Sequence, residues 1–132
     1  MSNFPDGAAS TAYQILVATS LDKLNEEEAD LWNTGKVADA ASVGITYGGK
    51  PLASRSLAYW KVRVWNQNDE ASDWSKPTLF GIGLLSDRDW AGNASFIGVE
   101  QADEKSQSAP LLRKQFTYHP VEGTVLLYVN SL

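Results

Sequence analysis

Side chains that could support covalent catalysis are sparse in this sequence. A Ser, Thr or Cys nucleophile needs a neighbouring base, which a third group must orient. The 132 residues contain one histidine, His119, and no cysteine. His119 precedes a proline in a predicted turn, so we interpret it as an exposed turn residue. The lack of cysteine excludes thiol catalysis, disulfides and zinc–thiolate sites within these residues.

Carboxylates are the other candidate groups, because glycoside hydrolysis uses a pair of them. None of the sixteen Asp and Glu residues lies at the end of a predicted strand in a segment whose sequence suggests a pocket. The run Glu26-Glu27-Glu28, followed by Asp30, could bind a cation, but it lacks the alternating ligands and the glycine of hard-cation loops. We interpret it as a solvated loop or one helical turn. Gly48-Gly49 lacks the Gly-Lys-Ser/Thr spacing of a phosphate loop. The sequence therefore predicts no catalytic residue, metal or cofactor.

Two tryptophans belong to the strongest predicted strand, residues 60–65, within the stretch 57–75. This segment alternates aromatic and β-branched residues with polar ones, the period of a half-buried strand. Trp60 shares a face with Val62 and Val64, which predicts that it is a core residue. Trp65 lies on the opposite face among cationic side chains, which favours a surface role.

Aromatic rings can also stack on cations or on sugars. Trp74 lies in the motif Ser72-Asp-Trp-Ser75, and we predict that it covers the hairpin edge or stacks on a strand side chain such as Arg63. Three other tryptophans are the candidate residues for stacking on a sugar: Trp65, Trp90 and Trp32. Packing within the protein or against a neighbouring domain is the alternative for each of them.

Composition indicates a globular chain, with 43% hydrophobic and 20% charged residues. The formal charge of −5 and the scattered Lys and Arg residues argue against a nucleic-acid partner. No apolar run reaches membrane-spanning length, and the first residues do not resemble a signal peptide, so no membrane partner is predicted. The localisation of the chain itself stays open.

The predicted elements are mostly strands, and the fold class is all-β with antiparallel pairing. A hairpin joins the strand at residues 60–65 to an apolar run at 79–82. A helical tendency is confined to residues 21–32. The other predicted strands cover residues 11–20, 42–47, 111–118 and 124–129.

The order of these motifs resembles a fibronectin type III module of the immunoglobulin-like class. A first strand is followed by a turn with Trp32-Asn-Thr-Gly35 and then by a second strand. The motifs Tyr59-Trp-Lys-Val-Arg-Val-Trp65 and Ser72-Asp-Trp-Ser75 come after it. The longer runs TAYQILVATS, ADLWNTGKV, SVGITYGGKPLASRSLAYWKVRVWNQND, SDWSKPTLFGIGLL and APLLRKQFT are together similar to the N-terminal region of bacterial α-L-rhamnosidases. The resemblance covers residues 11–129.

In that family, a fibronectin-type sandwich and a second β-sandwich precede the catalytic (α/α)₆ barrel. The resemblance therefore implies a non-catalytic accessory segment of a periplasmic or secreted glycoside hydrolase, which packs against and orients neighbouring domains. The catalytic carboxylates would belong to the barrel. The expected organisation is a flexible arm (1–10), a partial fibronectin-type module (11–84), a linker (85–110) and the first strands of a truncated second sandwich (111–132).

Two other functions compete with the packing role. One is a carbohydrate-binding module that stacks rhamnose-containing glycans on exposed tryptophans, and the other is a receptor-like adhesion module suggested by Ser72-Asp-Trp-Ser75. The first two strands of the fibronectin module are expected before Thr11 but are absent. We expect residues 111–118 or 124–129 to fill this gap, within the chain or in a homodimer formed by strand exchange.

Overall fold

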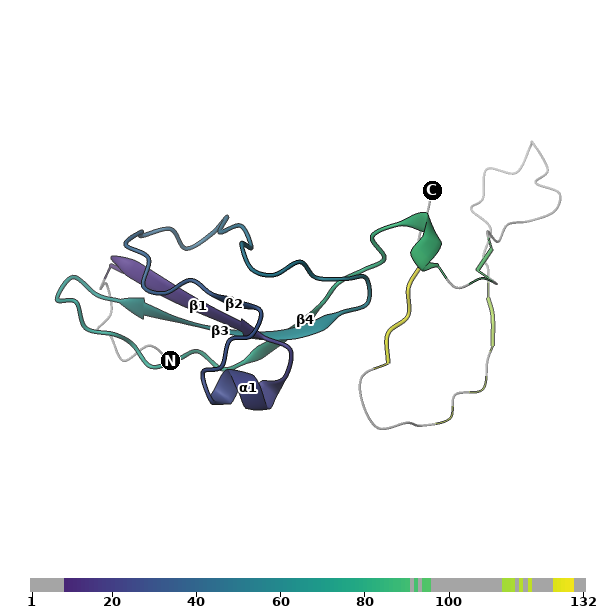
Figure 1. Ribbon diagram of the computed structural model, residues 1–132, viewed down its shortest axis with the longest axis horizontal. Coiled ribbons are helices and arrows are strands. Elements are labelled where there is room, and N and C mark those ends of the chain that lie inside the picture. Colours follow the sequence, from purple (N-terminus) through teal and green to yellow (C-terminus); the bar gives the residue numbers. More distant parts are fainter. Residues whose placement is uncertain are drawn as a thin grey trace. The chain divides into compact units, whose positions relative to one another are not determined.

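The computed structural model describes residues 9–90, 92, 94–95, 113–115, 117, 119 and 125–129. The chain divides into two compact units, Met1–Leu85 and Ser86–Leu132. The first unit contains the sheet and the helix α1 (Figure 1). The two units are described separately below, and the domain boundaries expected from the sequence stay a prediction.

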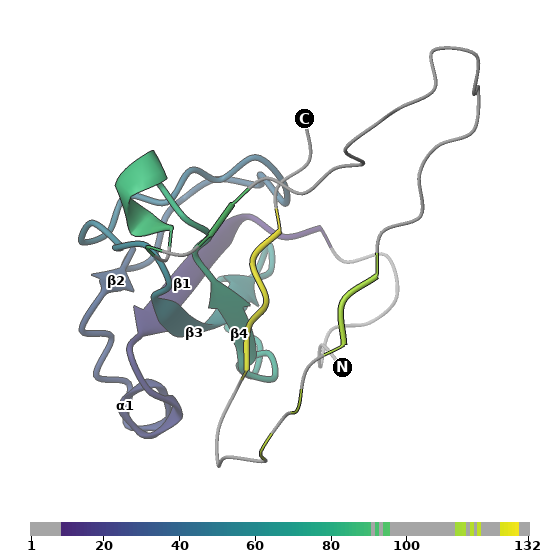
Figure 2. The ribbon, with the colours of Figure 1, turned by 90° about the vertical axis from the view of Figure 1, so that its right-hand side faces the viewer.

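One antiparallel sheet of four strands forms the first unit, in the order β2-β1-β3-β4 (Figure 2). The strands are β1 (Ala12–Ala18), β2 (Trp32–Asn33), β3 (Leu57–Trp65) and β4 (Thr78–Gly81). All seven residues of β1 pair with β3. The two long strands, rich in Val, Ile, Tyr and Trp, therefore form the centre of the sheet, with two short strands at its edges. The all-β antiparallel class predicted from the sequence is confirmed.

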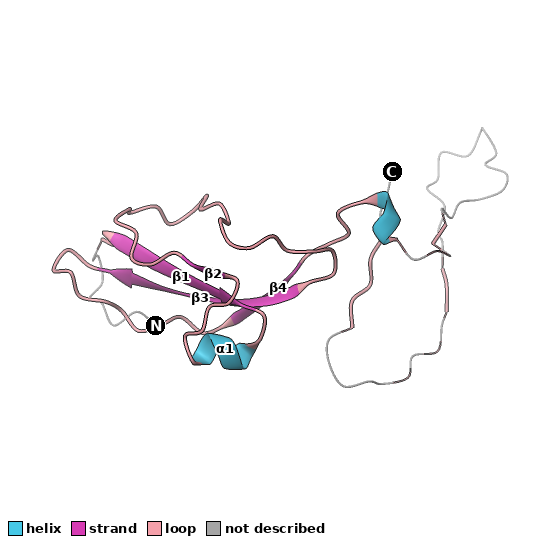
Figure 3. Ribbon diagram, in the orientation of Figure 1, coloured by secondary structure: helices cyan, strands magenta, loops and turns pink. Residues whose placement is uncertain are grey.

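The predicted hairpin and first strand are present, but the strand predicted over residues 42–47 is wrong. This segment has no regular secondary structure (Figure 3). Gly44 has a φ of +75°, in the left-handed region that interrupts an extended strand. Ile45 and Tyr47 still pack against the sheet, so alternating apolar residues serve packing here without strand pairing.

Each face of the sheet carries its own apolar cluster. On one face, here called the loop face, Ile15, Val17 and Ala58 are covered by apolar side chains from residues 31–47. On the other, the helix face, Leu16 and Ala18 of β1 pack with Leu24 of α1, the helix labelled in Figure 1. Burial of β1 from both sides explains its almost continuous apolar sequence.

The helix α1 (Leu21–Asn25) is a short element that depends on packing. The Ser20 hydroxyl caps it by accepting a hydrogen bond from the backbone N–H of Lys23 (3.3 Å). Five residues are too few for a stable isolated helix. Leu24 has no exposed surface and joins the helix-face cluster, which fixes α1 on the sheet. The helix lies within the segment predicted to have helical tendency.

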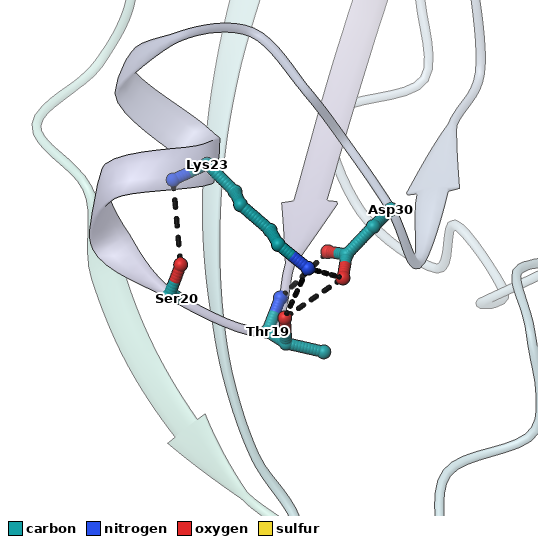
Figure 4. Close-up of polar contacts among 4 residues, drawn as sticks. All are labelled: Thr19, Ser20, Lys23 and Asp30. Atoms are coloured by element: carbon teal, nitrogen blue, oxygen red, sulfur yellow. Dashed lines mark hydrogen bonds and ion pairs between the residues drawn. The ribbon is translucent and has the colours of Figure 1, made fainter.

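The acidic run after α1 forms an exposed turn, as predicted, and Asp30 behind it closes the turn by polar contacts (Figure 4). Its carboxylate accepts hydrogen bonds from Lys23 Nζ (2.7 Å) and from the backbone N–H and hydroxyl of Thr19 (both 2.8 Å). Partial burial alone raises the pKa of Asp30. The hydrogen bonds from Lys23 and Thr19 and the positive charge of Lys23 outweigh that effect, and the pKa falls from 3.8 to about 2.

The lowered pKa of Asp30 gives an expected pH dependence. The carboxylate contributes to the free energy of unfolding above its unfolded pKa of 3.8, and this contribution is lost as pH falls to about 2. The side chain is 27% exposed, so we expect about 1–2 kcal/mol. Urea denaturation across this pH range should show the loss in the unchanged chain and a much smaller loss in Asp30→Asn. An equal pH dependence in both chains would contradict this role of Asp30.

The second unit contains a 3-10 turn, η1 (Asp87–Asp89), which Ser86 precedes. The backbone N–H and hydroxyl of Ser86 both donate hydrogen bonds to an Asp89 carboxylate oxygen (2.9 and 3.2 Å). Of the two strands predicted after residue 110, the described parts (113–115, 117 and 125–129) are not in a sheet. A strand is held by a hydrogen-bonded neighbour, and no described residue pairs with these parts. The remainder of both segments lies outside the described residues, and strand exchange stays a prediction.

Candidate functional site

The motif Ser72-Asp-Trp-Ser75 takes the place of a strand beside part of β3. Ser72 donates its backbone N–H to the Val64 carbonyl (2.8 Å), and its hydroxyl accepts the Val64 N–H (3.1 Å). Ser75 makes the same pair of bonds with Val62, at 2.8 and 3.1 Å. Each serine therefore satisfies both backbone groups of one valine. The two anchors fix the backbone on either side of Trp74.

Trp74 and Trp65 alternate with cationic side chains on the helix face. Arg63 Cζ lies 4.5 Å from the Trp74 ring centroid and 5.1 Å from that of Trp65. Lys61 Nζ lies 4.8 Å from Trp74, and Lys36 Nζ lies 5.1 Å from Trp65. We call these five side chains the cation–π stack. The predicted contact between Trp74 and Arg63 is confirmed.

Hydrogen bonds hold the members of the cation–π stack in place. Arg63 Nε donates to Gln14 Oε1 on β1 (3.0 Å), and Trp74 Nε1 donates to Glu27 Oε1 (3.0 Å). Glu27 has a φ of +59° in the turn after α1, a conformation that costs a non-glycine residue energy. Lys36 also forms an ion pair with Asp69. The stack therefore links the sheet, the turn after α1 and the loop after β3.

The predicted roles of Trp65 and Trp60 are wrong. Trp65 is 8% exposed and has cationic groups of two residues over its ring, so it is a structural residue and offers no free platform to a sugar. Trp60 does lie on the loop face with Val62, but it is 36% exposed. It pairs with Thr78 at the start of the short β4. The apolar side chains that cover the loop face pack on Ile15, Val17 and Ala58, of which Val17 is the cross-strand partner of Trp60.

The two remaining tryptophan candidates belong to different units and are described one at a time. Trp90 follows η1 in the second unit and is half-buried. Trp32 belongs to β2, with its ring 5.1 Å from that of Tyr47 in an edge-to-face arrangement. It also lines an open groove beside β1 and β2. Trp32 is therefore the sequence candidate for sugar binding that lines this groove.

The remaining sequence candidates for chemistry are His119 and the acidic side chains. His119 is exposed, as predicted. Throughout the described ranges, no group of three or more His, Asp or Glu side chains is arranged to hold a metal ion. No helix among those residues is long and apolar enough to span a membrane. The described residues thus offer packing and cation–π contacts rather than a reactive centre.

Comparison with known proteins places the first unit in a family. Residues 1–86 match the model of the Rha78A-like, N-terminal immunoglobulin domain. The chain belongs to this family. The resemblance to the N-terminal region of α-L-rhamnosidases is thereby confirmed, together with the immunoglobulin-like fold.

Individual relatives agree with this assignment of the Rha78A-like domain. An α-L-rhamnosidase of Formosa agariphila is 46% identical over 101 residues, which are 76% of this chain and 10% of that protein. The structure of α-L-rhamnosidase from Dictyoglumus thermophilum has a TM-score of 0.60 at 39% identity, covering 62% of this chain and 9% of that one. The Streptomyces avermitilis α-L-rhamnosidase complexed with L-rhamnose has a TM-score of 0.63 at 37% identity, covering 69% and 9%. The chain spans about a tenth of the length of these relatives.

Some residues of the Rha78A-like domain could not be found by sequence reasoning. Lys36 reaches the cation–π stack from the loop after β2, and Glu27 reaches it from a turn, so neither follows the strand period. Lys61 and Arg63, in contrast, alternate with Trp65 along β3 at a spacing of two. That spacing is the sequence signal for a shared face.

Proposed function

We propose that this Rha78A-like domain is a non-catalytic module that packs against and orients neighbouring domains of an α-L-rhamnosidase. Its relatives bear that enzyme name and are about ten times as long as the matched segment, which leaves the rest of such a chain for catalysis. No residue of this domain is assigned a catalytic role.

The exposure of Trp60 carries this proposal. A tryptophan that is 36% exposed leaves a large apolar ring in water, and Leu79 of the neighbouring β4 is 38% exposed. Trp60 pairs with Thr78 and lies on the loop face, whereas Leu79 pairs with Tyr59 and lies on the helix face, so the β3–β4 edge carries one exposed apolar side chain on each face. Exposed aromatic side chains of this size are typical anchors of protein interfaces. We call the exposed ring of Trp60 the edge surface.

The cation–π stack supports the same function from the opposite face of β3. A cation–π contact contributes about 0.5–1 kcal/mol at an exposed site and about 2 kcal/mol when desolvated. Four of them join five side chains here, of which Lys61 and Trp65 are buried. With the serine anchors they hold β3 and its surroundings in one arrangement. A stiff sheet suits a module that orients its neighbours, because a flexible support would not transmit a fixed geometry.

Chemical protection at the edge surface tests the packing role. A thiol introduced by Trp60→Cys should react with a maleimide in the isolated chain and be protected within a multi-domain enzyme that contains this domain. Equal reactivity in both would contradict packing through the edge surface.

A further inference from the structure

The strand β4 forms one edge of the sheet and lacks the features that usually protect an edge. Among the described residues it pairs with β3 alone, because the strand order is β2-β1-β3-β4. Exposed edges are commonly guarded by charged side chains, prolines or bulges, since their free backbone groups are templates for further pairing. The four residues Thr78–Gly81 include neither a charge nor a proline, and Pro77 lies just before them. The outer side of β4 is therefore open to another strand.

Half of the backbone groups of β4 point away from the sheet. The N–H of Ile82, just after β4, donates to the Ser56 carbonyl (2.9 Å), which sets the alternation of hydrogen-bonding direction along the strand. The N–H and C=O groups of Phe80, two residues earlier, therefore point to β3, and those of Leu79 and Gly81 point outward. Within the described residues, no hydrogen bond reaches the outward groups of Leu79 and Gly81.

Apolar side chains are exposed on both faces beside this edge. Leu79 is 38% exposed on the helix face. On the loop face, Trp60 of the neighbouring β3 is 36% exposed, next to Thr78, its cross-strand partner. A strand added to β4 would place its side chains alternately on these two faces. The edge thus fits a strand with apolar side chains on both faces, as in strands that are covered from both sides.

We propose that β4 pairs with a β-strand from a neighbouring domain of the enzyme. This inference rests on the proposed packing function and names the contact that holds a neighbour in one orientation. Backbone hydrogen bonds to Leu79 and Gly81 fix the register and the direction of the added strand, and the exposed side chains beside them select apolar residues. An exposed ring such as that of Trp60 anchors a partner, but paired strands also set its angle.

A second copy of this chain is a less favourable occupant of the β4 edge. Two such edges could exchange only a few hydrogen bonds, each of which contributes about 0.5–1.5 kcal/mol. Association of separate molecules costs about 4–15 kcal/mol, and two copies with a formal charge of −5 each also repel one another. A domain of the same polypeptide avoids most of this cost, because the connecting chain raises its effective concentration. The α-L-rhamnosidase relatives, about ten times as long as the matched segment, contain such further chain.

Amide hydrogen exchange, resolved to single residues by fragmentation mass spectrometry, tests the added strand. In the isolated chain, the outward amides of Leu79 and Gly81 should exchange rapidly, and the Phe80 amide, which faces β3, should exchange slowly. In a multi-domain enzyme that contains this domain, exchange at Leu79 and Gly81 should slow by at least about tenfold. Unchanged exchange at either residue in the multi-domain enzyme would overturn the proposal.

Two substitutions at Leu79 separate backbone pairing from side-chain contact. Leu79→Pro removes an outward N–H and no hydrogen bond to β3, since proline is tolerated where the N–H of an edge strand faces away from the sheet. Leu79→Ala shortens the side chain and keeps the N–H. In the multi-domain enzyme, slow exchange at Gly81 should be lost in Leu79→Pro and kept in Leu79→Ala. Slow exchange at Phe80 in both variants checks that β3 and β4 stay paired, and slow exchange at Gly81 in both would overturn the proposal.

Thiol labelling at position 60 distinguishes a failure of this inference from a failure of the packing function. A protected thiol in Trp60→Cys, together with rapid exchange at Leu79 and Gly81, would overturn strand addition and leave packing through the edge surface intact. A reactive thiol together with rapid exchange in the multi-domain enzyme would contradict both.

Discussion

Replacement of Trp65 by alanine should be the most damaging of the tryptophan substitutions. The side chain is 8% exposed and contacts Arg63 and Lys36 through its ring. Truncation of a buried aromatic residue costs about 3–5 kcal/mol. Trp65→Ala also removes the shared ring between two cations. Because an ordinary domain is stable by only about 5–15 kcal/mol, much of the folded population should be lost.

Trp60→Ala is the matched control, since it removes the same side chain from the same strand. Trp60 is 36% exposed, so its truncation should cost much less free energy of unfolding than that of Trp65. Urea denaturation followed by far-UV circular dichroism measures both changes, and similar slopes would show that the two unfolding reactions expose similar surface. A larger loss for Trp60→Ala would contradict the burial described for β3.

The second large effect is expected at Leu24 of α1. Leu24→Ala should lower the free energy of unfolding by about 2–5 kcal/mol, because the side chain is fully buried among Leu16, Ala18 and Tyr59. The five-residue helix has little stability of its own, so it should also lose its fixed position on the sheet. Amide hydrogen exchange at Lys23 to Glu28 reports this local loss.

Leu21→Ala provides the control on the same helix. Leu21 is 41% exposed, so the substitution should change the free energy of unfolding only slightly, and alanine has the higher helix propensity. Fast exchange of the α1 amides in Leu24→Ala alone would agree with packing as the source of helix stability. Equal effects of the two substitutions would contradict it.

The centre of the sheet could be predicted from the sequence because β1 and β3 follow a period of two. The same period placed Arg63 near Trp74, whose motif is anchored by two serines. The exposure of Trp60 could not be predicted this way, because it depends on where the covering loop packs and on how short β4 is. Alternation identifies which residues share a face, but not which part of the face is covered.

The groove beside β1 and β2 could not be predicted from the sequence either, and the reason is related. Its lining residues Asp39 and Thr46 belong to an irregular segment in which Gly44 has a positive φ, and the sequence favoured a strand there. Irregular backbone places side chains through individual turns and bonds, such as the Tyr13–Val37 pair, and no repeating period reveals it. Trp32 was a sequence candidate, but its polar neighbours in the groove were not.

Thiol protection at position 60 is the most direct measurement of the packing role. The chain has no cysteine, so Trp60→Cys introduces one thiol into it, and peptide mapping identifies the same site in a multi-domain enzyme. Val43→Cys is the control, because Val43 is 83% exposed and lines the groove, which should stay open. Packing predicts that a maleimide labels both positions in the isolated chain but labels only position 43 quickly in the multi-domain enzyme. Equally fast labelling of position 60 in both proteins would contradict the proposed function.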